Sequence, residues 1–456
     1  MQKKDFSILP LSKEMLHNLA EIGFEAMTPI QEASLPYILE GRDVIAQAKT
    51  GSGKTAAFGI GLLSRLDVKK FRVQSLVLCP TRELADQVAK ELRLLAKFAH
   101  NIKILTLCGG EAFGPQLGSL RHGAHIVVGT PGRILKHLKK ESLLLENMTT
   151  LVLDEADRML DMGFSEEINE VLDFVPQSRQ TLLFSATFAQ EILSISASIQ
   201  KDAISVKTTH HEVANKITER FYEVQNGQKR DTLINILSNF KPNNVIVFAN
   251  TKAEVIEIAQ TLQKNRIDAL AIHGDLEQYE RNDVLVQFAN KSCPVLVATD
   301  VAARGLDIKE LSMVVNYDLP HSQETYTHRI GRTARAGAEG LAFTLFAPYE
   351  EEKIEEYRSQ NRLFEEARSL EKQSGFEMSA PNITLVIEGG KKEKVRAGDI
   401  LGALTADGKL SGDDIGKIDI YDKQSYVAIK APKIDEAYEK LKYGKIKGKK
   451  FSVWIL

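Results

Sequence analysis

The chain has 456 residues, of which 43% are hydrophobic and 26% charged, and its formal net charge is −2. This length exceeds what one hydrophobic core usually serves, so about three domains are expected, and the composition is ordinary for a soluble globular protein. No apolar run approaches the ~20 residues of a membrane span, and the N-terminus lacks the apolar segment of a secretory signal. Cys79, Cys108 and Cys293 lie far apart without metal-binding spacing, which favours buried free thiols in a cytoplasmic protein.

Short apolar runs, each followed by a helix-prone stretch, fill most of the chain. Such runs are typical of the buried strands of a parallel sheet that helices cover on both faces. The alternation pauses near residues 201–220, so we expect two α/β domains with a boundary near 205–215. The predicted strands lie within residues 42–48, 75–81, 103–110, 125–130, 150–156, 181–187, 244–251, 268–274, 294–300, 313–319 and 340–348.

A third, smaller unit follows a charged, helix-prone stretch after Pro348. Its predicted elements follow the order β-α-β-β-α-β, which is that of the RNA-recognition-motif fold. The segment around Tyr426 lacks the paired aromatic residues of that fold, so we expect binding through loops and edges rather than base stacking across the sheet. The predicted domains are residues 1–207 and 208–360, a linker at 361–380, and a domain at 381–456.

A phosphate-binding loop is predicted between the first strand and the following helix. Backbone N–H groups of Gly51, Ser52 and Gly53 can hold phosphates at the positive end of the helix. Lys54 can reach the β- and γ-phosphates, and Thr55 can ligate Mg²⁺. A purely structural Gly-rich turn is the alternative.

Acidic residues follow the strand at 150–156. A carboxylate at the carboxyl end of a parallel strand lies where ligands bind, so Asp154 is a candidate Mg²⁺ ligand. Glu155 can orient and deprotonate a water molecule that attacks the γ-phosphate. An ordinary acidic helix start explains these residues separately but not their pairing with GSGKT.

Residues 154–157 spell DEAD, and the first ~350 residues resemble the DEAD-box RNA helicases in motif after motif. GFEAMTPIQ at 23–31 resembles the adenine-reading Q motif, and AKTGSGKT, PTRELADQ, GG at 109–110, TPGR and SAT follow in order. In the second half, QYER, ATDVAARGLDI and HRIGRTARAG match the remaining set, apart from Ala334, where many members have glycine. The resemblance implies two tandem RecA-like parallel-sheet domains, followed here by the small α+β RNA-recognition-motif-like domain.

The resemblance also assigns roles to residues of this sequence, with ATP and Mg²⁺ as cofactors. The implied ATP-binding residues are Phe6, Phe24, Gln31, Thr50, Gly51, Ser52, Gly53, Lys54, Thr55 and Asp307, the last at the ribose. The implied catalytic residues are Lys54, Glu155 and two arginine fingers, Arg332 and Arg335, and the metal ligands are Thr55 and Asp154. Residues that couple hydrolysis to unwinding are Asp157, Ser185, Thr187 and His328. The RNA contacts are Pro80, Thr81, Arg82, Gly110, Thr130, Gly132, Arg133, Gln278, Arg281 and Thr299.

The C-terminal segment is the more basic part of the chain. Residues 376–456 contain fifteen Lys and Arg against twelve Asp and Glu, a net of +3, which favours a polyanionic partner. The segment resembles the RNA-binding domain of bacterial family members that act on a 23S rRNA hairpin beside the peptidyl-transferase centre during 50S assembly. Scattered solvated lysines are the alternative to an RNA surface. The candidate contacts are Lys391, Lys392, Lys394, Arg396, Lys445, Lys447, Lys449 and Lys450.

We therefore expect an ATP-dependent RNA helicase that locally unwinds or rearranges 23S rRNA. Two other function classes remain open. One is an ATP-gated RNA clamp or chaperone without productive unwinding, and the other is a DNA helicase. The complete motif set disfavours both, and the RNA-type C-terminal segment also disfavours the DNA helicase.

Overall fold

The computed structural model describes residues 4–48, 51–207, 217–225, 227–303, 311–333, 339–358, 362–371, 373 and 375–456. They form two compact units, one up to Lys207 and one from Ile217 onward. Among these residues, no helix has both the length and the apolar character to cross a membrane. The three cysteines are buried free thiols, as expected.

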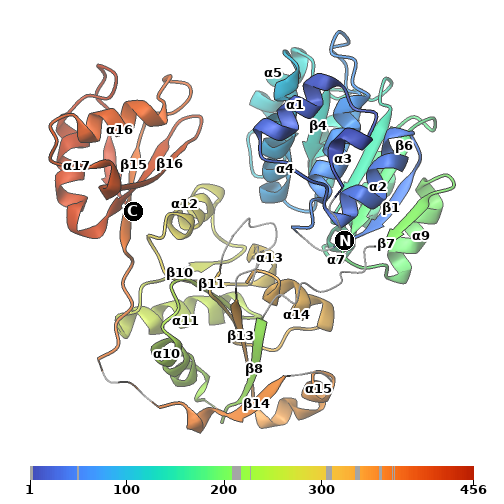
Figure 1. Ribbon diagram of the computed structural model, residues 1–456. Helices are drawn as coiled ribbons and strands as arrows, with labels where there is room; N and C mark the ends of the chain where they lie inside the picture. The colour runs from blue at the N-terminus through green and yellow to red at the C-terminus, as the bar shows by residue number, and fades with distance from the viewer. Residues whose placement is uncertain are drawn as a thin grey trace. The chain divides into compact units, whose positions relative to one another are not determined.

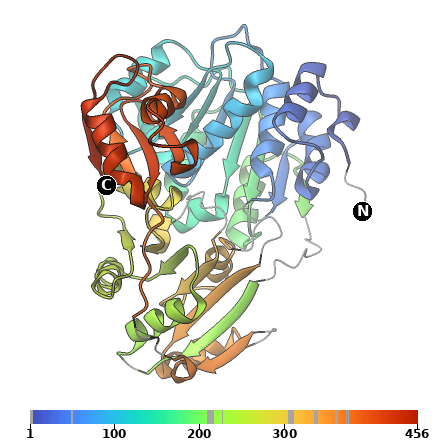
Figure 2. The ribbon, with the colours of Figure 1, turned by 60° about the vertical axis from the view of Figure 1, so that its left-hand side comes forward.

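The first unit is built on a seven-stranded, all-parallel sheet in the order β3-β4-β2-β5-β6-β1-β7. Helices cover both of its faces (Figures 1 and 2). Successive residues of a strand point to opposite faces of the sheet. In β5, Val152 packs with helices α1–α4, whereas Leu151 and Leu153 pack with α6–α9. The strands are β1 (Val44–Gln47), β2 (Ser75–Leu78), β3 (Ile104–Leu107), β4 (Ile126–Gly129), β5 (Thr150–Asp154), β6 (Gln180–Ser185) and β7 (Ile204–Lys207). The helices are α1 (Lys13–Glu21), α2 (Pro29–Leu39), α3 (Lys54–Ser64), α4 (Arg82–Leu95), α5 (Phe113–Arg121), α6 (Pro131–Lys139), α7 (Ala156–Asp161), α8 (Ser165–Leu172) and α9 (Gln190–Ile199).

The second unit repeats this topology. Its larger sheet is also all-parallel, in the order β10-β11-β9-β12-β13-β8-β14, which is the order of the first sheet with every strand number raised by seven. The predicted pair of RecA-like domains is thereby confirmed. The strands are β8 (Ile217–Glu223), β9 (Val245–Phe248), β10 (Ala269–Ile272), β11 (Val295–Ala298), β12 (Met313–Asn316), β13 (Gly340–Phe346) and β14 (Leu363–Glu366). The helices are α10 (Lys229–Phe240), α11 (Lys252–Lys264), α12 (Gln278–Ala289), α13 (Asp300–Ala303), α14 (Gln323–Ile330) and α15 (Glu351–Glu355).

Three strands lie where none was predicted. β7 and β8 fall in the expected pause between the domains, and β14 falls in the expected linker at 361–380. β7 and β14 are edge strands with mostly exposed or half-buried side chains, so neither shows a buried apolar run. Phe364 stacks on Phe221 with ring centroids 4.8 Å apart, which fixes β14 against the second sheet. The linker prediction was therefore wrong for residues 363–366.

The C-terminal domain has the predicted β-α-β-β-α-β order. Its antiparallel sheet runs β16-β17-β15-β18, and its core lies between the sheet and the two helices. The elements are β15 (Asn382–Ile387), α16 (Ala397–Thr405), β16 (Ile415–Ile420), β17 (Ser425–Lys430), α17 (Ile434–Tyr443) and β18 (Val453–Ile455).

The sheet of this domain packs against helix α12 of the same unit (Figure 1). Val286 of α12 contacts Val386 and Tyr426, a cross-strand pair on one face of the sheet. The Tyr426 hydroxyl donates to Asp283 Oδ1 at 2.8 Å, and Asn290 Nδ2 donates to Thr384 Oγ1 at 3.2 Å. Burial at this contact raises the pKa of both Asp283 and Tyr426. Tyr426 is therefore engaged by the protein itself, which agrees with the expectation that bases do not stack across this sheet.

Candidate nucleotide and RNA sites

The predicted phosphate-binding loop joins β1 to α3 and depends on glycine at two positions. Gly51 and Gly53 have φ of 81° and 94°, in the left-handed region that glycine adopts without strain. A Cβ on Gly53 would also lie 2.5 Å from Gln31 Nε2, so the Gln31 amide would have to move. The loop therefore delivers Lys54, which is only 5% exposed, at the first turn of α3.

Gln31 connects the predicted adenine-reading segment to this loop. Its Oε1 accepts from Thr28 N at 2.8 Å, and its Nε2 donates to Gly53 O at 3.1 Å. The amide keeps one N–H and one lone pair for a further partner, the pair of groups that reading an adenine edge requires. Phe6 packs edge-on against Phe24 and is buried in the core of the unit.

Asp154 and Lys54 face one another in the buried site. Lys54 Nζ lies 3.9 Å from Asp154 Oδ1. Burial raises the pKa of Asp154 to about 6, against the opposing effect of the Lys54 charge. Within the described part of the chain, Lys54 Nζ and Ser52 Oγ are buried without a hydrogen-bond partner. A cation with unused donors beside a carboxylate fits a nucleotide polyphosphate together with a hard divalent ion.

Glu155 occupies a strained position at the start of α7. Its φ and ψ are both 52°, a left-handed conformation that costs a non-glycine residue about 1–3 kcal/mol and that is concentrated at functional sites. Arg158 Nη1 lies 2.5 Å from Glu155 Oε2, and both side chains are buried. Arg158 was missed by the sequence reasoning, although it lies one helical turn after Glu155. The pair fixes the carboxylate at the edge of the site.

Asp157 links the strand that carries Asp154 to the predicted coupling segment. Its Oδ2 accepts from Ala186 N at 2.8 Å and from Thr187 N at 3.1 Å. Ser185 ends β6, and its carbonyl accepts from Ala48 N, directly before the phosphate-binding loop. The structure therefore brings Asp157, Ser185 and Thr187 together beside the nucleotide site.

The predicted RNA contacts of the first unit follow three adjacent strands, β2, β3 and β4, at one edge of the sheet. Arg82 Nη2 contacts Glu111 Oε1 at 2.5 Å. Arg133 donates to Gln116 Oε1 at 2.6 Å and to the Glu111 carbonyl at 2.9 Å. Glu111 and Gln116, which sequence reasoning missed, thus connect the arginines. The other predicted contacts here are Pro80, Thr81, Gly110, Thr130 and Gly132, all in the connections that follow these strands or in the first turn of α6.

A buried histidine in this network predicts an acid-sensitive first unit. Burial, then Arg133 and Lys136, lower the pKa of His137 from 6.5 to about 4. Between these values the unfolded chain binds a proton that the folded state does not, so stability falls as the pH falls from about 6.5 towards 4. We expect His137→Phe to remove this loss, with the wild type losing about 2–4 °C more in melting temperature than the variant between pH 7 and pH 5.

The measurement is thermal unfolding of the full-length protein at several pH values. Since the raised pKa of Asp154 acts in the opposite direction, the informative quantity is the difference between wild type and variant. His100→Gln, at an exposed position, is the matched control and should follow the wild type. Parallel pH curves for the wild type and His137→Phe would contradict the prediction.

In the second unit, the predicted residues lie on connected elements. Gln278 and Arg281 are on the first turns of α12, and Arg281 Nη2 donates to Ala302 O at 2.8 Å. Thr299 follows β11, His328 lies on α14, and Arg332 follows that helix and is buried. Thr50, Asp307 and Arg335 lie outside the described residues.

Arg329 is a further residue that sequence reasoning missed in the second unit. It is 2% exposed and forms two 2.7 Å hydrogen bonds to the Asp300 carboxylate. A bidentate pair of this kind is geometrically specific. It ties α14, which carries His328, to α13, which follows Thr299. The HRIGRTARAG motif contains Arg329 and was the sequence signal by which it could have been found.

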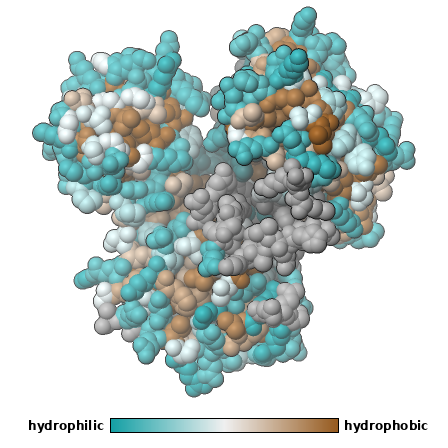
Figure 3. Space-filling model, in the orientation of Figure 1, coloured by the Kyte–Doolittle hydropathy of each residue, from teal (hydrophilic) through white to brown (hydrophobic). Residues whose placement is uncertain are grey.

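The two predicted basic segments of the C-terminal domain meet in space. All eight basic residues are exposed, and Lys447 Nζ donates to Lys394 O at 3.3 Å. The first segment is held by backbone bonds from Lys391 N to Tyr421 O and from Lys392 N to Asp422 O. We call the segments 391–396 and 445–450 the basic loops. The domain, at the upper left of Figure 3, has a largely hydrophilic rim.

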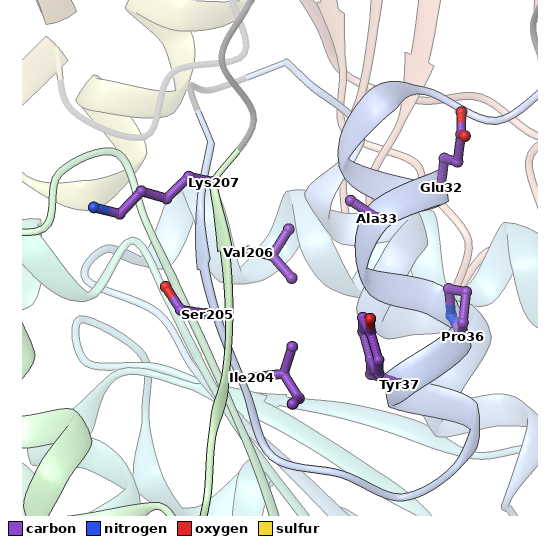
Figure 4. A pocket seen from close by; sticks show the side chains of 8 residues that line it. All are labelled: Glu32, Ala33, Pro36, Tyr37, Ile204, Ser205, Val206 and Lys207. Carbon is purple, nitrogen blue, oxygen red and sulfur yellow. The ribbon is translucent and has the colours of Figure 1, made fainter.

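An open groove of about 450 Å³ lies between α2 and β7 (Figure 4). It is lined by Glu32, Ala33, Pro36, Tyr37 and residues 204–207. None of the predicted site residues belongs to this lining. The groove is therefore separate from the candidate nucleotide and RNA sites.

Three family models match the chain in the order of its domains. Residues 28–195 match the DEAD/DEAH box helicase model, and residues 228–337 match the helicase conserved C-terminal domain. Residues 384–455 match the DbpA RNA binding domain. The resemblance predicted for the two larger domains and for the C-terminal domain is confirmed.

Two relatives and one solved structure support the same family assignment. The chain is 50% identical to the ATP-dependent RNA helicase DbpA of Escherichia coli (strain K12) over 451 residues, which are 99% of this chain and 98% of that protein. It is 42% identical to the DEAD-box ATP-dependent RNA helicase CshA of Bacillus cereus, over 85% of this chain and 72% of that protein. The structure of S. cerevisiae Dbp5 bound to RNA and ADP BeF3 shares 31% identity and a TM-score of 0.71, covering 80% of this chain and 96% of that one. With GSGKT, DEAD and SAT assembled at the carboxyl ends of β1, β5 and β6, the chain belongs to the DEAD-box family and is an ATP-dependent RNA helicase.

Proposed function

We propose that this helicase uses ATP hydrolysis to rearrange 23S rRNA locally during assembly of the 50S subunit, in the cytoplasm. The proposal rests mainly on the family match of the C-terminal domain. Residues 384–455 match the DbpA RNA binding domain, and the likeness to E. coli DbpA extends over 99% of the chain. The proposed partner is a 23S rRNA hairpin near the peptidyl-transferase centre.

The nucleotide site supports phosphoryl transfer to water. The loop N–H groups and Lys54 neutralise the phosphate oxygens, and Gln31 reads the adenine. Thr55 and Asp154 would hold Mg²⁺, which supplies charge neutralisation at the β- and γ-phosphates. Glu155 accepts the proton of the attacking water, and Arg158 holds it in place for that task. Asp157 accepts a hydrogen bond from Thr187 N, so a change at the nucleotide site can move the coupling segment.

The second domain completes the proposed site. Arg332 and Arg335 act there as arginine fingers on the γ-phosphate, and Asp307 contacts the ribose. ATP and RNA each bind both domains, so each favours the closed state and therefore the binding of the other. Hydrolysis removes the γ-phosphate link and allows the closed state to open.

Target choice is assigned to the C-terminal domain because the core contacts the RNA backbone, which carries no sequence information. Pro80, Thr81, Arg82, Gly110, Thr130, Gly132 and Arg133 in the first domain and Gln278, Arg281 and Thr299 in the second are the proposed backbone contacts. The basic loops are the proposed contacts to the rRNA hairpin.

The test compares stimulation of ATP hydrolysis by different RNAs. A 23S rRNA fragment that contains the hairpin should reach half-maximal stimulation at a concentration about 10²-fold lower than an unrelated RNA of equal length. A fragment with the hairpin stem disrupted and then restored by compensating base changes is the control. Equal stimulation by all three RNAs would refute the proposed target.

A further inference from the structure

Gln116, on α5, is a buried amide that joins the RNA-facing segments of the first domain. It is 5% exposed and uses all four of its hydrogen-bonding positions. Nε2 donates to Cys108 O and to Glu111 Oε2, both at 3.1 Å. Oε1 accepts from Arg133 Nη1 at 2.6 Å and lies 3.1 Å from His137 Nε2.

This pattern determines the orientation of the Gln116 amide. Because both donors of Gln116 point to acceptors, its oxygen must face Arg133 and His137. His137 Nε2 is placed to donate to that oxygen, and its Nδ1 lies 2.9 Å from the Ser142 hydroxyl, which also lies 3.0 Å from His137 O. A buried amide whose donors and acceptors are all satisfied favours one arrangement of the groups around it.

Glu111 extends the network to the second arginine. Its Oε1 contacts Arg82, its Oε2 accepts from Gln116, and its carbonyl accepts from Arg133. Arg82 begins α4 and Arg133 lies on α6, so one short segment after β3 fixes side chains from two separate helices. A guanidinium held in this way loses less conformational freedom when it binds a phosphate.

One donor of Arg82 is left unused by the network. Within the residues that the structure describes, Arg82 Nη1 is buried and has no hydrogen-bond partner. A buried unpaired donor is unfavourable unless something pairs with it on binding. An RNA phosphate supplies the acceptor oxygens that a guanidinium prefers.

We propose that Gln116 is a positioning residue for RNA binding: together with Glu111, it presents Arg82 and Arg133 as one preassembled unit for the RNA phosphate backbone. This inference rests on the proposed RNA contacts of the two arginines. It adds two residues that touch no substrate and act through residues that do. An amide that only stabilises the fold would change the melting temperature and leave RNA affinity unaltered.

The test measures RNA-stimulated ATP hydrolysis by the full-length Gln116→Leu variant. The RNA concentration for half-maximal stimulation should rise about 10-fold, since charge-assisted contacts are weakened. The KM for ATP, and kcat at saturating RNA, should stay within about twofold, because the nucleotide site is unaltered. Gln177→Leu, at an exposed position before β6, is the matched control. Gln116→Glu keeps an acceptor for Arg133 and should give a smaller loss if Gln116→Leu folds poorly.

A double-mutant cycle with Arg133→Ala decides how Gln116 acts. If Gln116 acts through Arg133, adding Gln116→Leu to Arg133→Ala should weaken RNA binding little further. Additive effects, or unchanged RNA dependence in both Gln116 variants while Arg133→Ala impairs binding, would overturn the positioning role alone. Unchanged RNA dependence in Arg133→Ala would overturn both this role and the proposed RNA contact.

Discussion

Glu155→Gln should lower kcat for RNA-stimulated ATP hydrolysis by about 10²–10⁴-fold, the usual contribution of a positioned general base. The amide keeps the size of the carboxylate and its contact with Arg158, but it cannot take a proton from water. Lys54 and Asp154 are untouched, so ATP binding should persist. Steady-state hydrolysis and equilibrium binding of a labelled nucleotide measure the two effects.

Strand displacement by the wild type, compared with the same variant, separates the helicase from an ATP-gated clamp, because a clamp would not displace strands even as the wild type. A clamp needs ATP binding, whereas repeated strand displacement needs hydrolysis to reopen the site. Glu155→Gln should therefore retain ATP-dependent RNA binding and lose multiple-turnover strand displacement. Glu146→Gln, at an exposed position, should behave as the wild type. Near-normal turnover in Glu155→Gln would remove Glu155 from the catalytic assignment.

Removing the charge of the first basic loop should abolish the preference for the rRNA hairpin. A variant with Lys391, Lys392, Lys394 and Arg396 all replaced by alanine loses four exposed cations. Neutralised phosphates dominate the salt-dependent part of RNA binding, so affinity for the hairpin fragment should fall on the order of 10²-fold at moderate salt. Stimulation by unrelated RNA should stay unchanged, because the core contacts remain. Titrations at two salt concentrations measure both effects.

The control for this variant is another set of four lysines in the same domain. Lys409, Lys417, Lys430 and Lys433 lie outside the basic loops, and their replacement by alanine removes an equal charge. Similar losses in both variants would mean that only net charge matters, which contradicts a defined RNA surface. The salt slope should decrease only in the basic-loop variant.

Truncating the C-terminal domain is a less specific experiment than these substitutions. The sheet of that domain covers Val286, and deleting it would leave this apolar side chain of α12 exposed. Asn290 would also lose its bond to Thr384. A truncated protein would therefore combine loss of RNA targeting with a damaged second domain.

Much of the fold could be predicted because buried parallel strands are continuous apolar runs. All eleven predicted runs contain a strand, from β1 in 42–48 to β13 in 340–348. β14 could not be found in this way, because its exposed and half-buried side chains leave no such run. An edge strand takes its structure from its neighbour rather than from its own pattern.

The candidate site was predictable where chemistry demands one residue type at one spacing. The motifs GSGKT and DEAD could be recognised from their residue types and spacing alone. Glu111 and Gln116 could not, since an exposed glutamate and a helical glutamine carry no signal until the fold brings Arg82 and Arg133 beside them. The contact of Tyr426 with Asp283 was equally hidden, because 143 residues separate them in the sequence.

Helix α12 carries predicted RNA contacts at its start and holds the C-terminal sheet near its end. Its first turns carry Gln278 and Arg281, and Asp283, Val286 and Asn290, on α12 or just beyond its end, hold the C-terminal sheet. The helix is 12 residues, or about 18 Å, long. Under the proposed function, the RNA contacts on α12 and those of the basic loops with the rRNA hairpin belong to the same compact unit. The docking of the C-terminal sheet on α12 would then set the spacing between the two RNA elements more than the length of the connecting chain does.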